Sequence, residues 1–481
     1  MSTIRRVAKN TAVLTLADII NKILSMVFVI YLARHLGDAG FGKYSFAFSF
    51  ANIFMIFADM GLTTLIVRDV ARDKSQSSQY LGNIILIKSI LAILVFGLIA
   101  IVITAMHYPY DTTMAVYIIG FSLILVSFSG SFASIFSAYE QMEYNAVIST
   151  LGKIIFVGLG LGAIFLGYGL IPIVSMFLIS NIFALMLSVF IVFKKFTKPK
   201  FEINYTFWKY LIKNSTPFLL TGIFASIYFY IDTIMLSVMK GDEVVGWYNA
   251  SYNLLSALIP FTAMFMYAVF PVFSRFFKDS KDYLKIGFIT SAKYLFIFAL
   301  PITVGTTLIS ENIIYFFYQS EFSNSIIALQ ILIWAFLFIS LNIVLYTLLN
   351  SINKQVLVTK ATAFGAVINV ILNLILIPKM SLIGASIATV ITEMSLLFIY
   401  YYYASKYLYT LPIPKIIYKP IIAVLFMSGF VLYFRDANIF LVVPIAAFIY
   451  FSVLFLIKGF TKNDIEMFRQ IIVKKSMQKS F

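Results

Sequence analysis

The chain has 481 residues, of which 61% are hydrophobic and 12% are charged, and its formal net charge is +16. Because soluble domains are about half apolar and about a quarter charged, this composition excludes a soluble globular protein and indicates a chain that lies in a bilayer. The lack of alternating strands of about ten residues excludes a porin-like barrel, and the lack of cysteine excludes a disulfide framework or a thiolate metal site.

Apolar segments long enough to cross a membrane recur along the whole chain. A helix needs about 20 apolar residues to cross a hydrocarbon core of roughly 30 Å, and about fourteen segments meet that requirement. The predicted spans are 10–33, 44–67, 81–106, 112–138, 145–167, 170–193, 214–239, 247–274, 284–309, 325–349, 355–377, 381–404, 417–434 and 438–458. The sequence therefore predicts an all-α integral membrane protein.

A repeated motif divides these spans into two sets. "LGDAGFGKY", Leu36 to Tyr44, and "KGDEVVGWY", Lys240 to Tyr248, share the pattern G-D-x-x-x-G-x-Y at an offset of 204 residues. Six spans lie within this offset, and because six is even, both copies enter the membrane in the same direction. Such parallel repeats are related by a pseudo-two-fold axis along the membrane normal, with a substrate path between them. Within the motif, glycine permits a tight outer turn and tyrosine is expected to anchor at the interface, so a structural role is favoured over ligand binding.

The repeat predicts three regions. Residues 1–200 form an N-lobe with spans one to six, residues 201–406 form a C-lobe with spans seven to twelve, and residues 407–481 hold two extra spans and a basic tail. The polar stretch "KKFTKPKFEINYTFWKY", Lys194 to Tyr210, is interpreted as an interfacial linker between the lobes. For the two extra spans, a hairpin that packs on one lobe and a platform for interactions both remain open.

The distribution of positive charge predicts the orientation. With the N-terminus inside, most of the 36 Lys and Arg residues fall on the cytoplasmic side of short loops, as the positive-inside rule requires. We therefore expect a multi-pass protein of the cytoplasmic membrane with both termini in the cytoplasm. This asymmetry and attraction to anionic lipid heads explain the net charge, so nucleic acid is not an expected partner.

Five lysines lie within predicted spans. Inserting a charged side chain at the middle of a membrane helix costs about 2.5 to 3.5 kcal/mol, so each of these lysines is a candidate for a functional role. Two pairs occupy nearly matching positions of the repeats, Lys88 with Lys293 and Lys153 with Lys360, and the fifth is Lys22. Their ammonium groups would face a central cavity and bind an anionic head group such as a phosphate or a pyrophosphate. The alternative is that each lysine snorkels back to the cytoplasmic interface.

Four acidic residues within the spans are candidates for proton or sodium coupling. They are Asp18, Asp59, Asp232 and Glu393. For Asp18, an ion pair with Lys22 one helical turn later is the alternative. Asp232 has no basic neighbour along its helix and is the better candidate. Asn369 and Asn373, four residues apart, share a helix face, which is typical of helix–helix contacts.

An enzyme is not predicted. The two histidines, His35 and His107, both lie in predicted outer loops, and the longest such loop, about 310–324, contains only Glu311 and Glu321 as acids. These residues provide no metal cluster and no general acid–base pair. We expect no catalytic residue, no metal and no cofactor beyond a coupling ion.

Three stretches resemble one known family. "ADMGLTTLIVRDVA", Ala58 to Ala71, is similar to the D-x-G-L...R-x-x-A signature of the polysaccharide-transporter branch of the multidrug/oligosaccharidyl-lipid/polysaccharide (MOP) exporter superfamily. "YLARHLGDAGFGKYSFAFS", Tyr31 to Ser49, and "LNLILIPKMSLIGASIATVITE", Leu372 to Glu393, resemble turns of the same family. The resemblance covers roughly residues 1 to 460.

The resemblance implies two six-helix lobes that form a V around a central cavity, with twelve or fourteen spans in total, and no chemical step. It assigns folding and gating roles to Gly37, Gly42, Tyr44, Asp59, Gly61, Leu62 and Arg68. The implied function is flipping of a polyprenyl phosphate- or pyrophosphate-linked oligosaccharide or polysaccharide repeat unit from the cytoplasmic to the outer leaflet by alternating access. Glycan polymerases or transferases and membrane lipids are the expected partners.

One alternative has the same fold. An ion-coupled exporter of drugs or other cations would need a net-acidic cavity, and five lysines against four acids within the spans favour the flippase. A membrane-bound polymerase or ligase of the same pathway is disfavoured by the short outer loops and by the parallel repeat. A scaffold would not need buried charge at symmetry-related positions.

Overall fold

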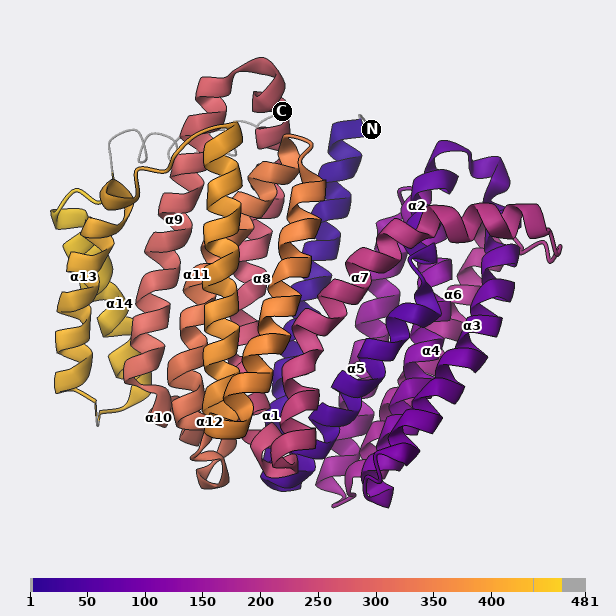
Figure 1. Cartoon of the computed structure of the whole chain (residues 1–481), viewed down its shortest axis with the longest axis horizontal. Coiled ribbons are helices and arrows are strands. Elements are labelled where there is room, and N and C mark those ends of the chain that lie inside the picture. Colours follow the sequence, from indigo (N-terminus) through magenta and orange to yellow (C-terminus); the bar gives the residue numbers. More distant parts are fainter. Residues whose placement is uncertain (1–2, 436, 461–481) are drawn as a thin grey trace, which may run out of the picture. The chain divides into compact units, whose positions relative to one another are not determined.

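The computed structural model describes residues 3–435 and 437–460, with side chains from residue 13 onward, and within these ranges it contains helices and no strands. Figure 1 shows the helices coloured along the chain. The helices are α1 (Thr3–Asp59), α2 (Leu62–Arg72), η1 (Lys74–Gln76), α3 (Ser77–Ala105), α4 (Tyr110–Ala138), α5 (Met142–Phe165), α6 (Leu170–Lys195), α7 (Tyr205–Lys240), α8 (Asp242–Asp279), α9 (Lys281–Leu308), α10 (Ser310–Tyr318), η2 (Ser320–Phe322), α11 (Ser325–Ser351), α12 (Gln355–Tyr407), α13 (Ile413–Tyr433) and α14 (Ile439–Leu456).

The predicted membrane crossings correspond to twelve long apolar helical segments in the described part of the chain. Two of these segments are too long for one crossing. The 57 residues of α1 would extend about 85 Å as one straight helix. Both α1 and α12 are interrupted by one non-helical residue, Gly37 and Ser381 respectively, and each therefore holds two helices. The integral membrane fold of about fourteen helices is thus confirmed.

Two of the predicted connections contain more helix than the predicted spans include. The outer turn before residue 44 is helical on both sides of Gly37, because glycine without a Cβ adopts φ 69° and reverses the chain at a single residue. The predicted outer loop at about 310–324 contains α10 and η2. The sequence of α10, "SENIIYFFY", is mostly apolar, which suits a short helix better than a solvated loop.

Close contacts divide the described residues into two compact units. The first holds the chain up to Pro260, with Ile314–Ala328 and Thr359–Thr392; the second holds Phe261–Ile313, Leu329–Val358 and the described residues from Glu393 onward. These boundaries fall inside helices. The predicted regions 1–200, 201–406 and 407–481 follow the repeat and not the contacts, so they stay a prediction.

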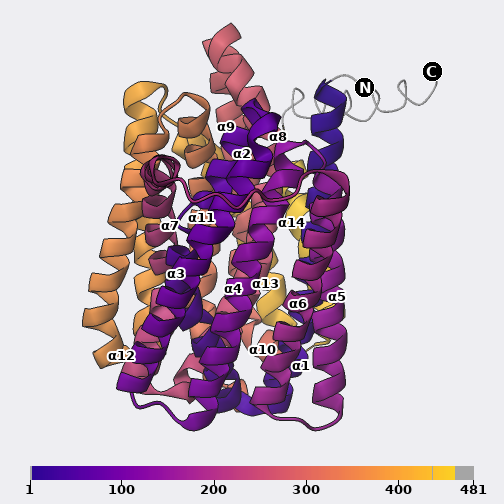
Figure 2. The same ribbon diagram turned by 90° about the vertical axis from the view of Figure 1, so that its right-hand side faces the viewer.

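The first unit is built around α1 and α4. Extensive helix contacts join α4 to α6 and α1 to α5, and Figure 2 shows α4 between α3 and α6. Alternating small and large side chains of α1, including Ala47, Phe50 and Ala51, pack against Ile99 of α3 and Ile119 of α4. Since lipid tails are as apolar as leucine, such close packing, rather than exclusion of water, holds membrane helices together.

The linker between the repeats is attached to α3. The Lys200 backbone N–H donates to the Ser78 carbonyl oxygen at 3.0 Å, and the Ser78 hydroxyl donates to the Lys198 carbonyl oxygen at 2.6 Å. At the start of α7, the Trp208 indole N–H donates to the Asn83 side-chain oxygen at 2.8 Å. The linker therefore lies on the first repeat, and the start of α7 is held there with it.

The two extra helices belong to the second unit and pack against α9 within it. α13 contacts both α14 and α9, and the Tyr450 hydroxyl of α14 donates to the Ile297 carbonyl oxygen of α9 at 2.9 Å. This arrangement agrees with the hairpin alternative for these spans.

Candidate functional site

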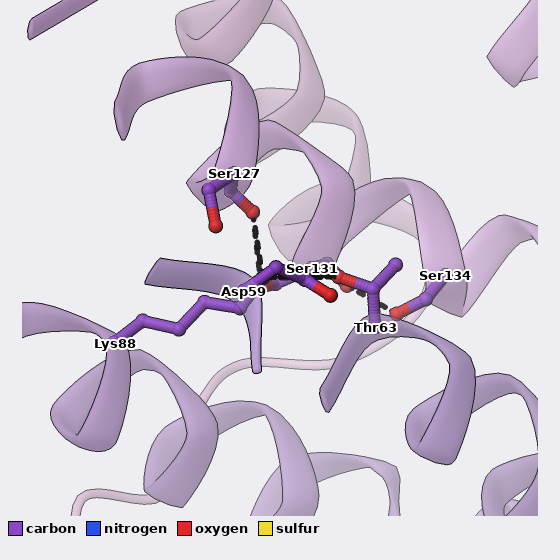
Figure 3. A network of polar contacts seen from close by, with 6 residues as sticks. All are labelled: Asp59, Thr63, Lys88, Ser127, Ser131 and Ser134. Atoms are coloured by element: carbon purple, nitrogen blue, oxygen red, sulfur yellow. Dashed lines mark hydrogen bonds and ion pairs between the residues drawn. The ribbon is translucent and has the colours of Figure 1, made fainter. Parts of the chain in front are cut away.

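The first buried polar network lies where α1 ends and α2 begins. Asp59 is the last residue of α1, and Gly61 reverses the chain with φ 73° before α2. Lys88 of α3 extends its ammonium nitrogen to 2.7 Å from Asp59 Oδ1, and it also donates to Thr63 Oγ1 at 3.0 Å and to the Ser127 carbonyl oxygen at 2.8 Å (Figure 3). The Thr63 hydroxyl donates to Asp59 as well. All three donor positions of the ammonium group are therefore used.

This arrangement changes the interpretation of Lys88. Its side chain is 1% exposed, whereas that of Asp59 is 27% exposed. The expected ammonium group facing an open cavity is therefore not what this structure has, because Asp59 neutralises it in place. The related position in the other repeat differs, since Lys293 is half-buried on α9 with its nitrogen 5.9 Å from the centre of the Tyr294 ring.

The second buried network surrounds Asp232 of α7, which is 6% exposed. Its Oδ2 accepts hydrogen bonds from the Tyr248 hydroxyl of α8 and the Thr389 hydroxyl of α12, both at 2.8 Å. Its Oδ1 accepts a hydrogen bond from the amide of Asn373, which also donates to Asn369 Oδ1 at 3.1 Å. Among the described residues, no Lys or Arg lies within ion-pair distance of Asp232. The cage consists of neutral groups around one carboxylate.

Sequence reasoning found part of this cage. The predicted shared face of Asn369 and Asn373 is confirmed, and the reversal at Ser381 brings the later half of α12 back beside them. Tyr248 was missed, because as the last residue of the repeated motif it was expected to anchor at the interface. That expectation is wrong for Tyr248, which is 1% exposed and bonded to Asp232. Thr389 carried no signal in the sequence.

Lys22 and Lys153 form a third group. Lys22 of α1 is exposed and lines a small cavity of about 70 Å³ together with Asn253 and Ser256 of α8. Lys153 of α5 is half-buried and, like Lys22, lies on one of two helices that contact each other. In the described part of the chain, neither lysine forms an ion pair with a carboxylate, so the alternative pairing of Lys22 with Asp18 is not observed.

A polar contact lies beside these lysines, because Asn21 directly precedes Lys22 and Ser149 lies one helical turn before Lys153. The Asn21 amide nitrogen is 3.5 Å from Ser149 Oγ, across the contact between α1 and α5. The side-chain oxygen of Asn21 is buried and has no hydrogen-bond partner among the described residues. The region thus contains two cations and an unsatisfied polar atom, and no acidic side chain lines the cavity.

The remaining predicted residues each have their own surroundings. Lys360 is exposed on α12. Glu393, which is 5% exposed, accepts a hydrogen bond from the Asn342 amide at 2.8 Å within the second unit. Arg68 Nε lies 2.7 Å from Asp69 Oδ1, and the Tyr80 and Tyr210 hydroxyls donate to the same carboxylate, each at 3.1 Å. Asp69 therefore joins α2 to α3 and α7, and Arg68 holds its carboxylate in place.

Two larger cavities lie in the second unit. One, of about 400 Å³, is lined by α9, α10, α13 and α14. The other, of about 310 Å³, is lined by α9, α11, α12 and residues at and just before the start of α13. No charged side chain lines either of them. Neither cavity suits an ionic head group.

A parallel repeat of long apolar helices, with buried carboxylates inside the bundle, defines a transporter of the MOP type. The fold is similar to that of a solved structure titled "Lipid II flippase MurJ, inward closed conformation", with a TM-score of 0.76, 18% identity, and coverage of 93% of this chain and 98% of that chain. The model of the family "Polysaccharide biosynthesis protein" matches residues 7–277, and the chain belongs to this family, as the sequence resemblance predicted. The MatE family model matches residues 217–375.

Two curated relatives align with most of the chain. One is the "Probable low-salt glycan biosynthesis flippase Agl15" of Haloferax volcanii, 22% identical over 391 residues and aligned over 80% of each chain. The other is the "Lipid II flippase MurJ" of Bacillus subtilis, 24% identical over 436 residues and also aligned over 80% of each chain. Both relatives are named as flippases, which agrees with a transporter and not an enzyme.

Proposed function

We propose that this protein moves a glycan linked to a polyprenyl phosphate or pyrophosphate from the cytoplasmic to the outer leaflet. The observation that carries the proposal is that Lys22 and Lys153 lie on two contacting helices, beside the contact of Asn21 with Ser149, with no carboxylate within ion-pair distance of either lysine among the described residues. One relative is named as a glycan biosynthesis flippase and the other as a lipid II flippase, and both names support this substrate class.

The physical argument concerns charge compensation. Two ammonium groups that repel each other in a membrane interior are costly unless an anion lies between them, because like charges in a poorly hydrated site disfavour each other's charged form. Lys22 lies about 22 Å along α1 from the turn at Gly37, so it is well inside the bilayer. A phosphate oxygen can accept from both lysines, which bind it as point charges. The polyprenyl chain would remain in the lipid.

The size of the cavity indicates that this site must widen. A volume of about 70 Å³ holds about two water molecules and cannot admit a sugar. Alternating access by rocking of one repeat against the other would open it, first toward the cytoplasm and then toward the outside. No bond in the substrate breaks during this cycle.

Asp232 is the proposed site of the coupling ion. A buried carboxylate without a cationic partner is costly, so it would take up a proton or a metal cation from solution. Hydroxyl and amide groups surround the Asp232 carboxylate, and the side-chain oxygen of Asn373 is buried with no hydrogen-bond partner among the described residues. Oxygen ligands of this kind suit Na⁺ as well as a proton. Binding here would bias the arrangement of α7 relative to α12.

The cellular setting follows from the charge distribution. We place the protein in the plasma membrane with both termini in the cytoplasm, on the basis of the Lys and Arg residues in its short loops. A glycosyltransferase that supplies the lipid-linked glycan and a polymerase that consumes it are the proposed partners.

The rival function is export of a cation, and the MatE match over residues 217–375 favours it as the second candidate. Such an exporter would bind its substrate with carboxylates. The cavity beside Lys22 has no acidic lining residue, which favours an anionic substrate.

The test is flipping of a fluorescent polyprenyl-diphosphate sugar in proteoliposomes. We expect the double variant Lys22→Gln/Lys153→Gln to lose at least about tenfold in rate, because each charge-assisted hydrogen bond to phosphate contributes on the order of 1.5 to 3 kcal/mol. The control is Lys200→Gln/Lys379→Gln, which removes the same charge from exposed positions. Wild-type flipping in the Lys22/Lys153 variant would contradict the proposal. Gradient-driven uptake of a cationic dye without flipping would establish the exporter instead.

A further inference from the structure

The two apolar cavities of the second compact unit lie at different positions along α9. The inner cavity, of about 310 Å³, is lined by α9 residues between Phe288 and Phe296, and the outer cavity, of about 400 Å³, by α9 residues from Phe298 onward. In the inner cavity Phe288 is buried, whereas Phe398 and Ile413 are exposed, so this cavity runs from the surface into the unit. Because protein interiors are close-packed, a cavity of this size and lining is expected to hold an apolar ligand.

Two lysines continue the α9 wall of the inner cavity toward the start of the helix. Lys281 and Lys285 lie seven and three residues before Phe288, and these spacings place them on the helix face that lines the cavity. Both lysines are exposed, and among the described residues neither has a carboxylate within ion-pair distance. The inner cavity therefore has two uncompensated cations at one end.

Tyr409 holds the connection between α12 and α13 beside these lysines. Its hydroxyl donates to the Lys281 carbonyl oxygen at 3.2 Å, and the Lys285 ammonium nitrogen lies 5.1 Å from the centre of its ring. Two residues later the chain reaches Leu411, which lines the inner cavity. Because the ring is neutral, it attracts the ammonium group without cancelling its charge. The connection thus brings the cations and the apolar lining together.

The outer cavity has different surroundings. Its lining includes Ile313 of α10 and contains no charged side chain. Glu311, two residues before Ile313, pairs with Arg435 at 2.7 Å. The positive charge near the outer cavity is therefore compensated within the protein, whereas the two lysines beside the inner cavity have no such partner among the described residues.

We propose that the inner cavity and its two lysines bind an anionic phospholipid of the cytoplasmic leaflet. One acyl chain would lie in the cavity, and the phosphate would lie at Lys281 and Lys285, which bind it as point charges. In the predicted orientation α9 and α13 begin on the cytoplasmic side, where negatively charged lipid heads bind basic pockets between membrane helices. From Lys285 to Phe296 the α9 face extends about 16 Å, close to half of a hydrocarbon core of roughly 30 Å, so the site matches one leaflet.

The lipid site is independent of the proposed function. Its cations lie at one end of the cavity only, so its ligand stays in one leaflet, whereas a flipped substrate changes leaflet. The cavity is lined by α9, α11, α12 and α13, and a bound acyl chain would join the first of the two extra helices to the other three. The lipid would thus be a structural ligand of the second unit.

The first test measures binding of dioleoyl phosphatidylglycerol and dioleoyl phosphatidylcholine to the purified full-length protein in detergent by native mass spectrometry. We expect phosphatidylglycerol to bind at least about tenfold more tightly, because each lysine near an anionic head group contributes roughly fivefold. Lys281→Gln/Lys285→Gln should lose this preference. The control Lys406→Gln/Lys415→Gln removes the same charge from exposed positions at the ends of α12 and α13 and should keep the preference within twofold. An unchanged preference in the Lys281/Lys285 variant would overturn the proposal.

The second test fills the cavity and leaves the lysines in place. Ala292→Phe adds a ring to the inner cavity, and Ala446→Phe is the control, because Ala446 lines the outer cavity. We expect only Ala292→Phe to weaken phosphatidylglycerol binding several-fold, since the acyl chain loses its packing contacts with the cavity wall. Wild-type binding by Ala292→Phe protein would refute the site, because the lysines would then attract head groups without a bound chain. If this variant does not fold, the lysine variants decide.

Competition with undecaprenyl phosphate identifies the occupant. At equal concentration we expect it to displace less than half of the phosphatidylglycerol bound to the wild-type protein. Displacement of most of the phosphatidylglycerol would make the cavity a site for a polyprenyl chain and would contradict the proposal. These measurements need no flipping, so they decide the lipid site even if the protein flips no lipid-linked glycan.

Discussion

Asp59 and Asp232 are both carboxylates within the bundle, but the protein compensates their charges in different ways. Asp59 has a permanent cation, since the Lys88 nitrogen lies at 2.7 Å and is itself enclosed. Asp232 is surrounded by neutral donors from Tyr248, Thr389 and Asn373. A fixed counter-ion suits a contact that holds helices together. Neutral donors orient a carboxylate without compensating its charge, which suits the proposed binding of a mobile cation.

The neighbourhood of each residue agrees with this difference. Asp59 lies beside the chain reversal at Gly61, where a Cβ would lie 2.9 Å from the Ser215 carbonyl oxygen of α7. A joint packed so tightly needs a rigid attachment, and the ion pair to α3 provides it. Asp232 joins α7, α8 and α12, which belong to the second repeat, and in the proposed cycle its cage would change when an ion enters or leaves.

The largest expected effect is on folding stability, from Lys88→Met. Removing one partner of a buried ion pair leaves an uncompensated charge, which costs about 3 to 5 kcal/mol. Because Asp59 is 27% exposed, we expect the lower end of that range. Thermal unfolding of the purified protein in detergent measures the loss.

The control is the double variant Asp59→Asn/Lys88→Met, which removes both charges. We expect it to recover most of the stability, since a neutral pair has no charge left to compensate. If the single and the double variants are equally unstable, Lys88 stabilises the protein through its packing and not through its charge. The proposed difference in charge compensation between Asp59 and Asp232 would then be wrong.

The second effect is on coupling, from Asp232→Asn. The amide has nearly the same shape and keeps polar contacts in the cage, so we expect the free energy of unfolding to change by less than about 1 kcal/mol. Stimulation of flipping by an imposed proton or sodium gradient should disappear, on the order of tenfold in rate if the ion shifts the equilibrium by about 1.4 kcal/mol. Gradient-dependent flipping in proteoliposomes is the measurement.

The control here is Asp18→Asn, which removes a carboxylate from an exposed position on α1. Its flipping should still respond to the gradient. A full gradient response in Asp232→Asn protein would place the coupling ion elsewhere, and Glu393 would then be the next residue to change.

The sequence predicted the membrane fold because apolar length and a repeated turn motif are local properties. It predicted the shared face of Asn369 and Asn373 for the same reason, since four residues are about one helical turn. It could not pair Lys88 with Asp59 or bring Tyr248 and Thr389 to Asp232, because these contacts join different helices. The position of a charged residue along its helix does not determine which side chain of another helix it contacts.

The motif G-D-x-x-x-G-x-Y shows the same limit within a single stretch. Its glycine turns were predictable from the residue type and are confirmed by φ 69° at Gly37 and φ 93° at Gly241. The role of its tyrosine was not predictable, because Tyr44 is half-buried beside Phe48 and Tyr248 is fully buried beside Asp232. Equivalent residues in two repeats diverge when their neighbours differ.

The smallest expected effect comes from an ion pair of the same length in a different environment. Arg435 and Glu311 approach to 2.7 Å, the same distance as Lys88 and Asp59, but their side chains are 52% and 46% exposed. Water and salt screen such a pair, so Arg435→Gln should lower the free energy of unfolding by less than about 1 kcal/mol. Thermal unfolding at low and high salt, measured beside Lys88→Met, checks this. A loss for Arg435→Gln as large as that for Lys88→Met would show that N–O distance, and not burial, sets the contribution of an ion pair in this protein.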